Sequence, residues 1–144
     1  MADFFNLQRF LDAQARDYSR ALQEIQNGRK VGHWIWYIFP KLKGGRSYNS
    51  DYYGIGSLEE AKAYYDHPLL GSRLIEITEA LLEHKDKPAV AILSPIDARK
   101  VKSCMTLFWI ASGNPLFKTV IDVFYKGQMD HKTLRVVGQP PCIP

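Results

Sequence analysis

SPIDARKVKSCMTLFWIASG, residues 94–113, carries the signals of one long helix. A serine followed by proline is typical of a helix start, and Gly113 is typical of the residue just past a helix end. One apolar face at helical spacing is formed by Val101, Cys104, Met105 and Phe108. We therefore predict a helix here, with that face buried in the core.

Helical signals recur on both sides of this stretch. Asn27-Gly28 and Gly127 are typical helix ends, and Ser57 with Glu60 forms a capping box, in which each side chain accepts from a free backbone amide. No segment shows a sustained alternation of apolar and polar residues, the pattern typical of a strand. Caps and apolar spacing predict helices over about residues 7–11, 17–26, 31–39, 57–66, 68–85, 95–112, 115–126 and 131–137.

These helices predict an all-α fold, a compact multihelical single domain of about six to eight helices. The domain is expected to span residues 1–144, with an extended Gly-rich loop near residues 40–56 and an irregular tail over residues 138–144. Hydrophobic residues make up 46% of the chain and charged residues 24%, which is the composition of a globular rather than a disordered protein.

The sequence also argues against several classes of protein. No apolar run approaches the length of about 20 residues that spans a membrane, and residues 1–5 do not resemble a secretory signal. We therefore expect a cytoplasmic protein without membrane contacts, in which Cys104 and Cys142 are reduced thiols. No metal site is expected, because the four histidines are isolated from one another: His33, His67, His84 and His131. No cofactor is expected either.

A basic, aromatic stretch occupies residues 29–54. Five cations and no carboxylate lie between Arg29 and Ser50, although the whole chain has a net charge of only +4. Aromatic rings, glycines and hydroxyl groups lie among these cations, a combination suited to an anion attached to a flat group. The candidate ligand-binding residues are Trp36, Lys41, Arg46, Ser47, Ser50 and Tyr53, with His33 as the candidate general acid or base.

Each of these residues also has a purely structural interpretation. Trp34 and Trp36 at helical spacing are typical of a core, His33 can be a buried hydrogen-bonded side chain, and the loop cations can be solvated surface. A second polar face, for which a solvated edge is the favoured interpretation, lies on the helix from Ser94 and contains Asp97, Lys100, Ser103 and Cys104.

Five motifs spread over nearly the whole chain carry a family resemblance. They are Phe5-Asn6-Leu7-Gln8-Arg9-Phe10, His33-Trp34-x-Trp36-x-x-Phe39-Pro40, Arg46-Ser47-x-x-Ser50-x-x-Tyr53-Gly54-Ile55, His67-Pro68-x-Leu70-Gly71-x-Arg73-Leu74 and Lys100-x-x-Ser103-Cys104-Met105-Thr106-Leu107-Phe108. On these motifs the chain resembles DUF1810, a family without an established activity. The resemblance implies a multihelical, bacterial, cytoplasmic protein. Some members are labelled calpastatin, but that inhibitor is an extended disordered chain, unlike a compact aromatic-rich domain.

The chain departs from the family pattern at three places. Lys41 stands where the pattern usually has glutamine, Gly44-Gly45 stands where it has Gly-Leu-Gly, and Cys104 stands where it tends to have serine. A role that a glutamine amide plays in relatives therefore does not carry over to Lys41.

Three hypotheses for the function follow. The leading one is a domain that binds a small anionic, nucleotide-like ligand, with Lys41 and Arg46 holding the anion, Trp36 stacking on the flat group and His33 moving a proton. The first alternative is a module that binds nucleic acid, for which the net charge is weak support, or another protein. The second alternative is a structural homodimer formed through the aromatic run. The sequence leaves open whether the protein is an enzyme and what its oligomeric state is.

Overall fold

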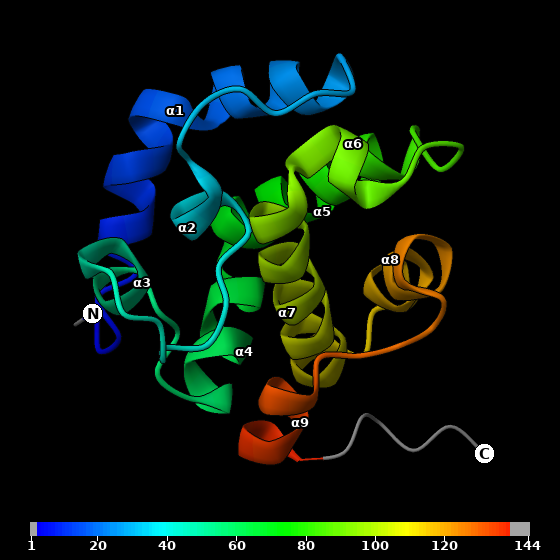
Figure 1. Cartoon of the computed structure of the whole chain (residues 1–144). Coiled ribbons are helices and arrows are strands. Elements are labelled where there is room, and N and C mark those ends of the chain that lie inside the picture. The colour runs from blue at the N-terminus through cyan, green and yellow to red at the C-terminus, as the bar shows by residue number, and fades with distance from the viewer. Residues whose placement is uncertain (1–2, 139–144) are drawn as a thin grey trace.

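A central helix, α7 (Pro95–Ser112), organises residues 3–138, the part of the chain that the computed structural model describes. Figure 1 shows α7 running down the middle of the molecule, in contact with α4 (Leu58–Asp66), α6 (Ala89–Leu93), α8 (Pro115–Tyr125) and α9 (His131–Val137). Six consecutive residues of α7, from Cys104 to Trp109, are buried. The predicted helix over residues 95–112 is confirmed, but residues 104–109 are buried on all sides because neighbouring helices surround them.

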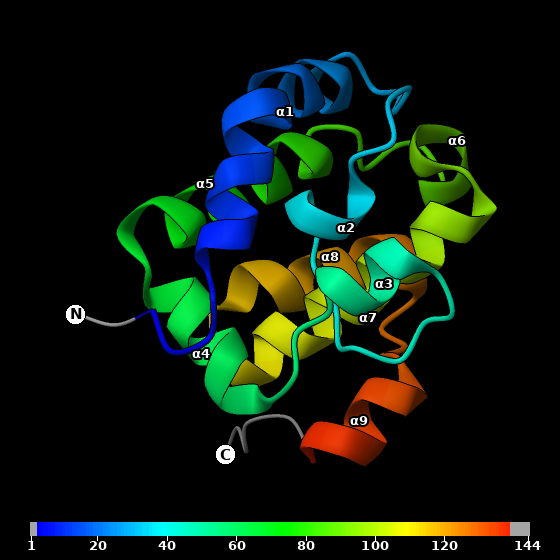
Figure 2. The ribbon, with the colours of Figure 1, turned by 90° about the vertical axis from the view of Figure 1, so that its left-hand side faces the viewer.

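The remaining helices complete an all-helical arrangement. α1 (Gln8–Gln26) contacts α5 (Pro68–Leu82) and α2 (Ile35–Ile38), and α5 also contacts α4 and α8. Figure 2 shows α1 across the top of the molecule with α5 and α2 beneath it. A short helix, α3 (Tyr48–Tyr52), lies in the loop between α2 and α4. Residues 3–138 thus contain nine helices and no strand, which confirms the all-α prediction and exceeds the expected number by one.

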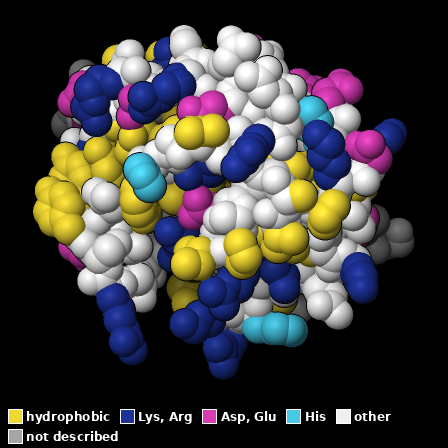
Figure 3. Space-filling model, turned by 45° about the horizontal axis from the view of Figure 1, so that its top comes forward, with side chains coloured by type: hydrophobic (Ala, Val, Ile, Leu, Met, Phe, Trp, Pro, Cys, Tyr) yellow, Lys and Arg dark blue, Asp and Glu magenta, His cyan; other side chains and the backbone are white. Residues whose placement is uncertain are grey.

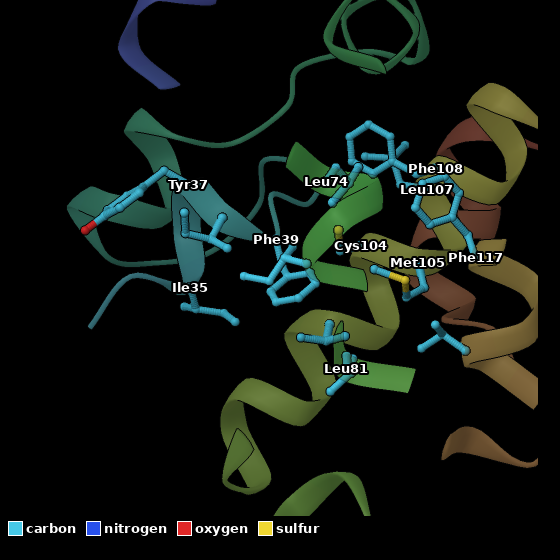
Figure 4. Close-up of a cluster of buried hydrophobic side chains, with 14 of the residues drawn as sticks. Ile35, Tyr37, Phe39, Leu74, Leu81, Cys104, Met105, Leu107, Phe108 and Phe117 are labelled. Atoms are coloured by element: carbon cyan, nitrogen blue, oxygen red, sulfur yellow. The ribbon is translucent and has the colours of Figure 1, made fainter. Parts of the chain in front are cut away.

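Apolar side chains from several helices meet beside α7. Figure 4 shows Phe39, Leu74, Cys104 and Phe108 in one cluster with Phe117 of α8. The Phe108 and Phe117 ring centroids lie 6.1 Å apart. Full burial of each such side chain contributes about 1.5–3 kcal/mol to folding. Burial raises the pKa of the Cys104 thiol, so this cysteine is a protonated, small apolar core residue.

The prediction of two short helices at the N-terminus is wrong. Residues 8–26 form one helix, and they contain no glycine or proline that would stop it. Asp17, expected to begin the second helix, lies inside α1 and its carboxylate accepts a hydrogen bond from the Tyr37 hydroxyl. The same carboxylate pairs with Arg20, one turn further along α1. Asp17 therefore joins α1 to α2.

The helix expected over residues 31–39 is reduced to the four residues of α2. The backbone amides of Val31 and Gly32 and the Trp34 indole all donate to one carboxylate oxygen of Glu24, each at 2.8 Å. This carboxylate holds residues 31–34 as a loop, because their donors are used outside a helical ladder. Burial alone would raise the pKa of Glu24. The three hydrogen bonds stabilise the ionised carboxylate more strongly, so the pKa is lowered.

Helix caps agree with the sequence in part. Ser57 accepts from the Glu60 amide at 3.1 Å as predicted, whereas the Glu60 carboxylate accepts from Gly56 rather than from Ser57. Ser94 makes no side-chain cap and begins α7 with a left-handed φ of 79°. The short helices α3 and α6 were not predicted, because each offers only about one turn of signal.

Two predictions concern the ends of the chain and membranes. Cys142 and the predicted tail beyond Gly138 lie outside the described residues, and Gly138 itself ends α9. Between residues 3 and 138, none of the helices combines the length and apolar character needed to cross a membrane.

Gly71→Ala is expected to destabilise the protein by about 2–3 kcal/mol, because an alanine Cβ would lie 1.9 Å from the Tyr65 carbonyl oxygen where α4 meets α5. The better helix propensity of alanine, about 1 kcal/mol, is too small to compensate. Gly56→Ala is the control, since its Cβ would meet Glu60 at an ordinary 3.4 Å. Urea unfolding measures both variants, and equal stabilities would contradict the proposed close contact.

Glu24→Gln is expected to unfold at a lower temperature than the wild type at pH 7. The difference between the two unfolding temperatures should become smaller in acid. A carboxyl whose folded pKa is below its unfolded pKa stabilises the fold above the unfolded value, and loses that effect as pH falls through the folded pKa. Thermal unfolding from pH 7 down to about 3 tests this. A gap that stays constant over this range would show that ionisation of Glu24 does not hold the loop.

Candidate functional site

A small hollow between α2, α3 and α7 is lined mainly by aromatic rings and two lysines, and we call it the aromatic hollow. Its volume is about 250 Å³, including the part open to solvent. Its lining residues are Ile35, Trp36, Phe39, Lys41, Asn49, Ser50, Tyr53, Gly54 and Lys100.

A larger depression, which we call the basic groove, adjoins the aromatic hollow and shares Lys41 and Lys100 with it. It lies between α7, α9 and the loop that follows Pro40, and its volume is about 1340 Å³ including open solvent. Figure 3 shows lysine and arginine side chains gathered on the lower part of one face of the molecule. One carboxylate, from Asp130, lines the groove together with seven cations: Lys41, Lys43, Arg99, Lys100, Lys102, Lys132 and Arg135.

The structure brings four of the seven residues proposed from the sequence to one hollow: Trp36, Lys41, Ser50 and Tyr53. The other three line neither depression. His33 is exposed in the loop held by Glu24, and Arg46 is exposed between Pro40 and α3. The Ser47 hydroxyl accepts from the Ser50 amide at 3.1 Å, so Ser47 begins α3 as its cap.

A buried arginine of α1 positions the wall of the aromatic hollow that carries Tyr53. Arg9 donates to the carbonyls of Tyr52 at 2.8 Å and Gly54 at 3.0 Å, and to the Glu60 carboxylate at 2.6 Å. Its remaining donors reach the carbonyls of Phe5 and Asn6. All five N–H groups of the guanidinium are therefore satisfied, and residues 52–54 are fixed against α1 and α4.

The position of Lys41 follows from that of residues 52–54. The Ile55 amide donates to the Lys41 carbonyl, and the Ile55 carbonyl accepts from the Lys43 amide, both at 2.9 Å. The loop around Leu42 and the segment at Ile55 therefore form a single β-bridge. Gly54 lets them approach, because a Cβ there would lie 2.7 Å from the Lys43 Cα. Backbone pairing thus places Lys41 where the aromatic hollow and the basic groove meet.

Trp36, which lines the aromatic hollow, has an indole N–H without a partner within residues 3–138. Its ring lies 4.9 Å below the Lys100 ammonium, which occupies one face of the indole as a cation–π partner. Its Nε1 is buried and has no hydrogen-bond partner, an arrangement that costs about 1–3 kcal/mol. Thr78 Oγ1 and Trp109 Nε1 share this property, but neither residue lines the two depressions.

The charges around Lys41 are mostly of its own sign. Burial lowers the pKa of Lys41, and repulsion from Lys100 and Lys132 adds to that effect, whereas Asp130 opposes it. The Asp130 carboxylate is already used as the cap of α9, where it accepts from the amide and the hydroxyl of Thr133 at 3.0 and 2.6 Å. The site therefore holds more positive charge than its own carboxylates compensate.

Sequence reasoning missed the α7 and α9 side of the site. The sequence favours a solvated edge for Lys100 and Ser103 and gives no signal for Lys132 and Arg135, although all four line the groove. The available signal was the polar face of α7, which includes Lys100 and Ser103 one turn apart. What the sequence did not contain was the packing of α9 against that face, which the Asp130 amide secures by donating to Thr106 Oγ1 at 3.0 Å.

Comparisons with known proteins agree with the resemblance seen in the sequence. The pattern of a protein family of unknown function, DUF1810, matches residues 4–137. A crystal structure of a conserved hypothetical protein from Mycobacterium tuberculosis is similar, with 42% identity, a TM-score of 0.92, and coverage of 94% of this chain and 98% of that chain. No curated protein matches. With the match extending over almost all of the described residues, this chain belongs to the DUF1810 family.

Proposed function

We propose that this protein binds a small anionic ligand with a flat, nucleotide-like part, held across the aromatic hollow and the basic groove. The observation that carries the proposal is their junction, where Lys41 and Lys100 line both depressions. Rings on one side of that junction and cations on the other match the two halves of a nucleotide.

Charge supports an anion in the groove. Seven cations face one carboxylate there, and two of the cations, Lys132 and Arg135, are exposed on α9. The charged form of Lys41 carries an energetic cost, because the side chain is half-buried beside other lysines and its pKa is lowered. A bound anion would offset this cost, so binding gains energy that the free protein lacks.

Size supports a division of the ligand between the two depressions. Small-molecule pockets usually measure about 300–1,000 Å³, whereas the aromatic hollow encloses only about 10 Å³ once the space open to solvent is left out, too little for a whole ligand. In the proposal, the hollow opens further to admit the edge of a flat ring, to which Trp36 Nε1 donates, and the anionic part lies in the groove. Trp36 then acts as a donor rather than as a free stacking surface, because Lys100 covers one of its faces.

Binding is the function proposed for this site, and a cytoplasmic location, where nucleotides are abundant, is part of the proposal. A single-stranded nucleic acid is the second candidate, favoured by the larger volume and the openness of the groove to solvent. The two candidates differ in how affinity depends on length, because one nucleotide suffices for the first and several phosphates are needed for the second.

Adenosine, AMP, ADP and ATP are expected to stabilise the protein increasingly with phosphate number. At about tenfold excess over its dissociation constant, ATP should raise the unfolding temperature by at least about 3 °C. The double variant Lys132→Ala/Arg135→Ala should weaken ATP binding by about tenfold or more, since it removes two charged donors. Thermal unfolding and isothermal titration calorimetry measure these effects.

The matched control is Lys62→Ala/Lys85→Ala, which removes the same net charge from exposed positions outside both depressions. It should bind ATP as the wild type does. Equal losses of ATP affinity in the two double variants would show that the effect comes from net charge alone. No stabilisation by any nucleotide would contradict the proposal. Affinity that appears only with single-stranded oligonucleotides and rises with their length would favour the second candidate.

A further inference from the structure

Lys41 lies at the one place where the apolar and the cationic parts of the candidate site touch. Its side chain lines both depressions, and its backbone is fixed by the hydrogen bond from Ile55. Ile35, Trp36 and Phe39 surround the hollow on one side of it. The amine is therefore partly removed from water but remains open to a ligand in either depression.

The Lys41 amine has no ionic partner among the described residues. Its recorded hydrogen bond is a long one, 3.5 Å, to the Leu42 carbonyl. Lys30 and Lys100, which are also partly buried, differ in this respect, since Lys30 lies 2.8 Å from the Asp97 carboxylate and Lys100 lies 3.6 Å from it. The charged groups that act on Lys41 are Lys100, Asp130 and Lys132.

These surroundings make the ammonium form of Lys41 less favourable than that of a lysine in water. Burial disfavours the charged form, and the neighbouring cations Lys100 and Lys132 disfavour it further, so the pKa of Lys41 is lowered. Only the neutral amine has the free electron pair that attacks a carbonyl carbon. A desolvated lysine beside another cation is a known way to obtain an amine nucleophile near neutral pH.

We propose that Lys41 forms a reversible imine with the carbonyl group of a phosphorylated aldehyde or ketone bound in the basic groove. This inference rests on the proposed function, because the groove must hold the phosphate for the carbonyl to reach the amine. It concerns this chain in particular, since the family resemblance predicts glutamine at this position.

The chemistry needs no further reactant. The nitrogen electron pair adds to the carbonyl carbon, and the carbonyl oxygen leaves as water with both amine protons. The products are one imine and one water molecule, and hydrolysis reverses the step. Groove cations would orient the phosphate, and the aromatic hollow would exclude water from the new carbon–nitrogen double bond.

Pyridoxal 5′-phosphate is a suitable probe, because it is an aromatic aldehyde with a phosphate. The full chain is incubated with the probe and sodium cyanoborohydride, which reduces an imine to a stable secondary amine, and labelled peptides are mapped by mass spectrometry. Lys41 should be labelled at least about fivefold faster than the other groove lysines, because more of it is neutral at pH 7. These comparators are Lys43, Lys102 and Lys132.

Two variants separate the nucleophile from simple charge. Lys41→Arg keeps the positive charge but has no amine that can form an imine, so the adduct at position 41 should disappear while labelling of the comparator lysines continues. Lys100→Met should shift the pH profile of Lys41 labelling to higher pH, since it removes a repelling cation. Pyridoxal without phosphate should label Lys41 several-fold more slowly, as the groove cannot hold it.

The failures of the two proposals are distinguishable. Labelling spread evenly over the groove lysines, with nucleotide binding intact, would overturn the imine inference and leave the binding function standing. Even labelling together with no stabilisation by nucleotides would overturn both. Preferential labelling of Lys41 that is equally fast without the phosphate would overturn the phosphorylated ligand class.

Discussion

The buried guanidinium of Arg9 is the interaction on which the arrangement of the site depends. It satisfies all five of its donors, joining the start of α1 to residues 52–54 and to Glu60 of α4. Breaking a buried pair of this kind typically costs about 3–5 kcal/mol, because one charge is left without compensation. The consequence reaches beyond α4, since residues 52–54 lead into Ile55, whose backbone pairs with Lys41. One arginine thus sets both Tyr53 and Lys41 against α7.

The candidate site combines this rigid support with uncompensated charge. The carboxylates in and near the site are used inside the fold: Glu60 by Arg9, Asp97 by Lys30 and Lys100, and Asp130 by the cap of α9. Seven cations remain around the basic groove with one carboxylate among them. Such a surplus is energetically unfavourable in the free protein and is relieved by an anion, which is the physical basis of the binding proposal. Charge alone does not determine how an anionic ligand is oriented in the groove. Trp36 and Lys41, at the edge of the groove, would fix that orientation.

Local signals made much of the fold predictable. The all-α class, the long α7 and a last helix over residues 131–137 follow from caps, prolines and apolar spacing, and each is present. The errors lie where long-range contacts override local signals. Asp17 lies at the start of a predicted helix, but its carboxylate instead joins α1 to Tyr37. Residues 31–34 are predicted to be helical, but Glu24 holds them as a loop. The site was predictable in the half that is continuous in sequence, Trp36 to Tyr53, whereas Lys100, Lys132 and Arg135 arrive there only through helix packing.

The central claim is that one ligand occupies both depressions, and the indole N–H signals of the three tryptophans test it directly by nuclear magnetic resonance. During a titration with ADP, the account predicts that the Trp36 signal moves together with backbone amides of residues 41–44 and 132–135. The Trp34 indole is bonded to Glu24 and Trp109 lines neither depression, so their signals should stay in place. Bound ADP that leaves the Trp36 signal unmoved, or that moves all three signals equally, would contradict the account.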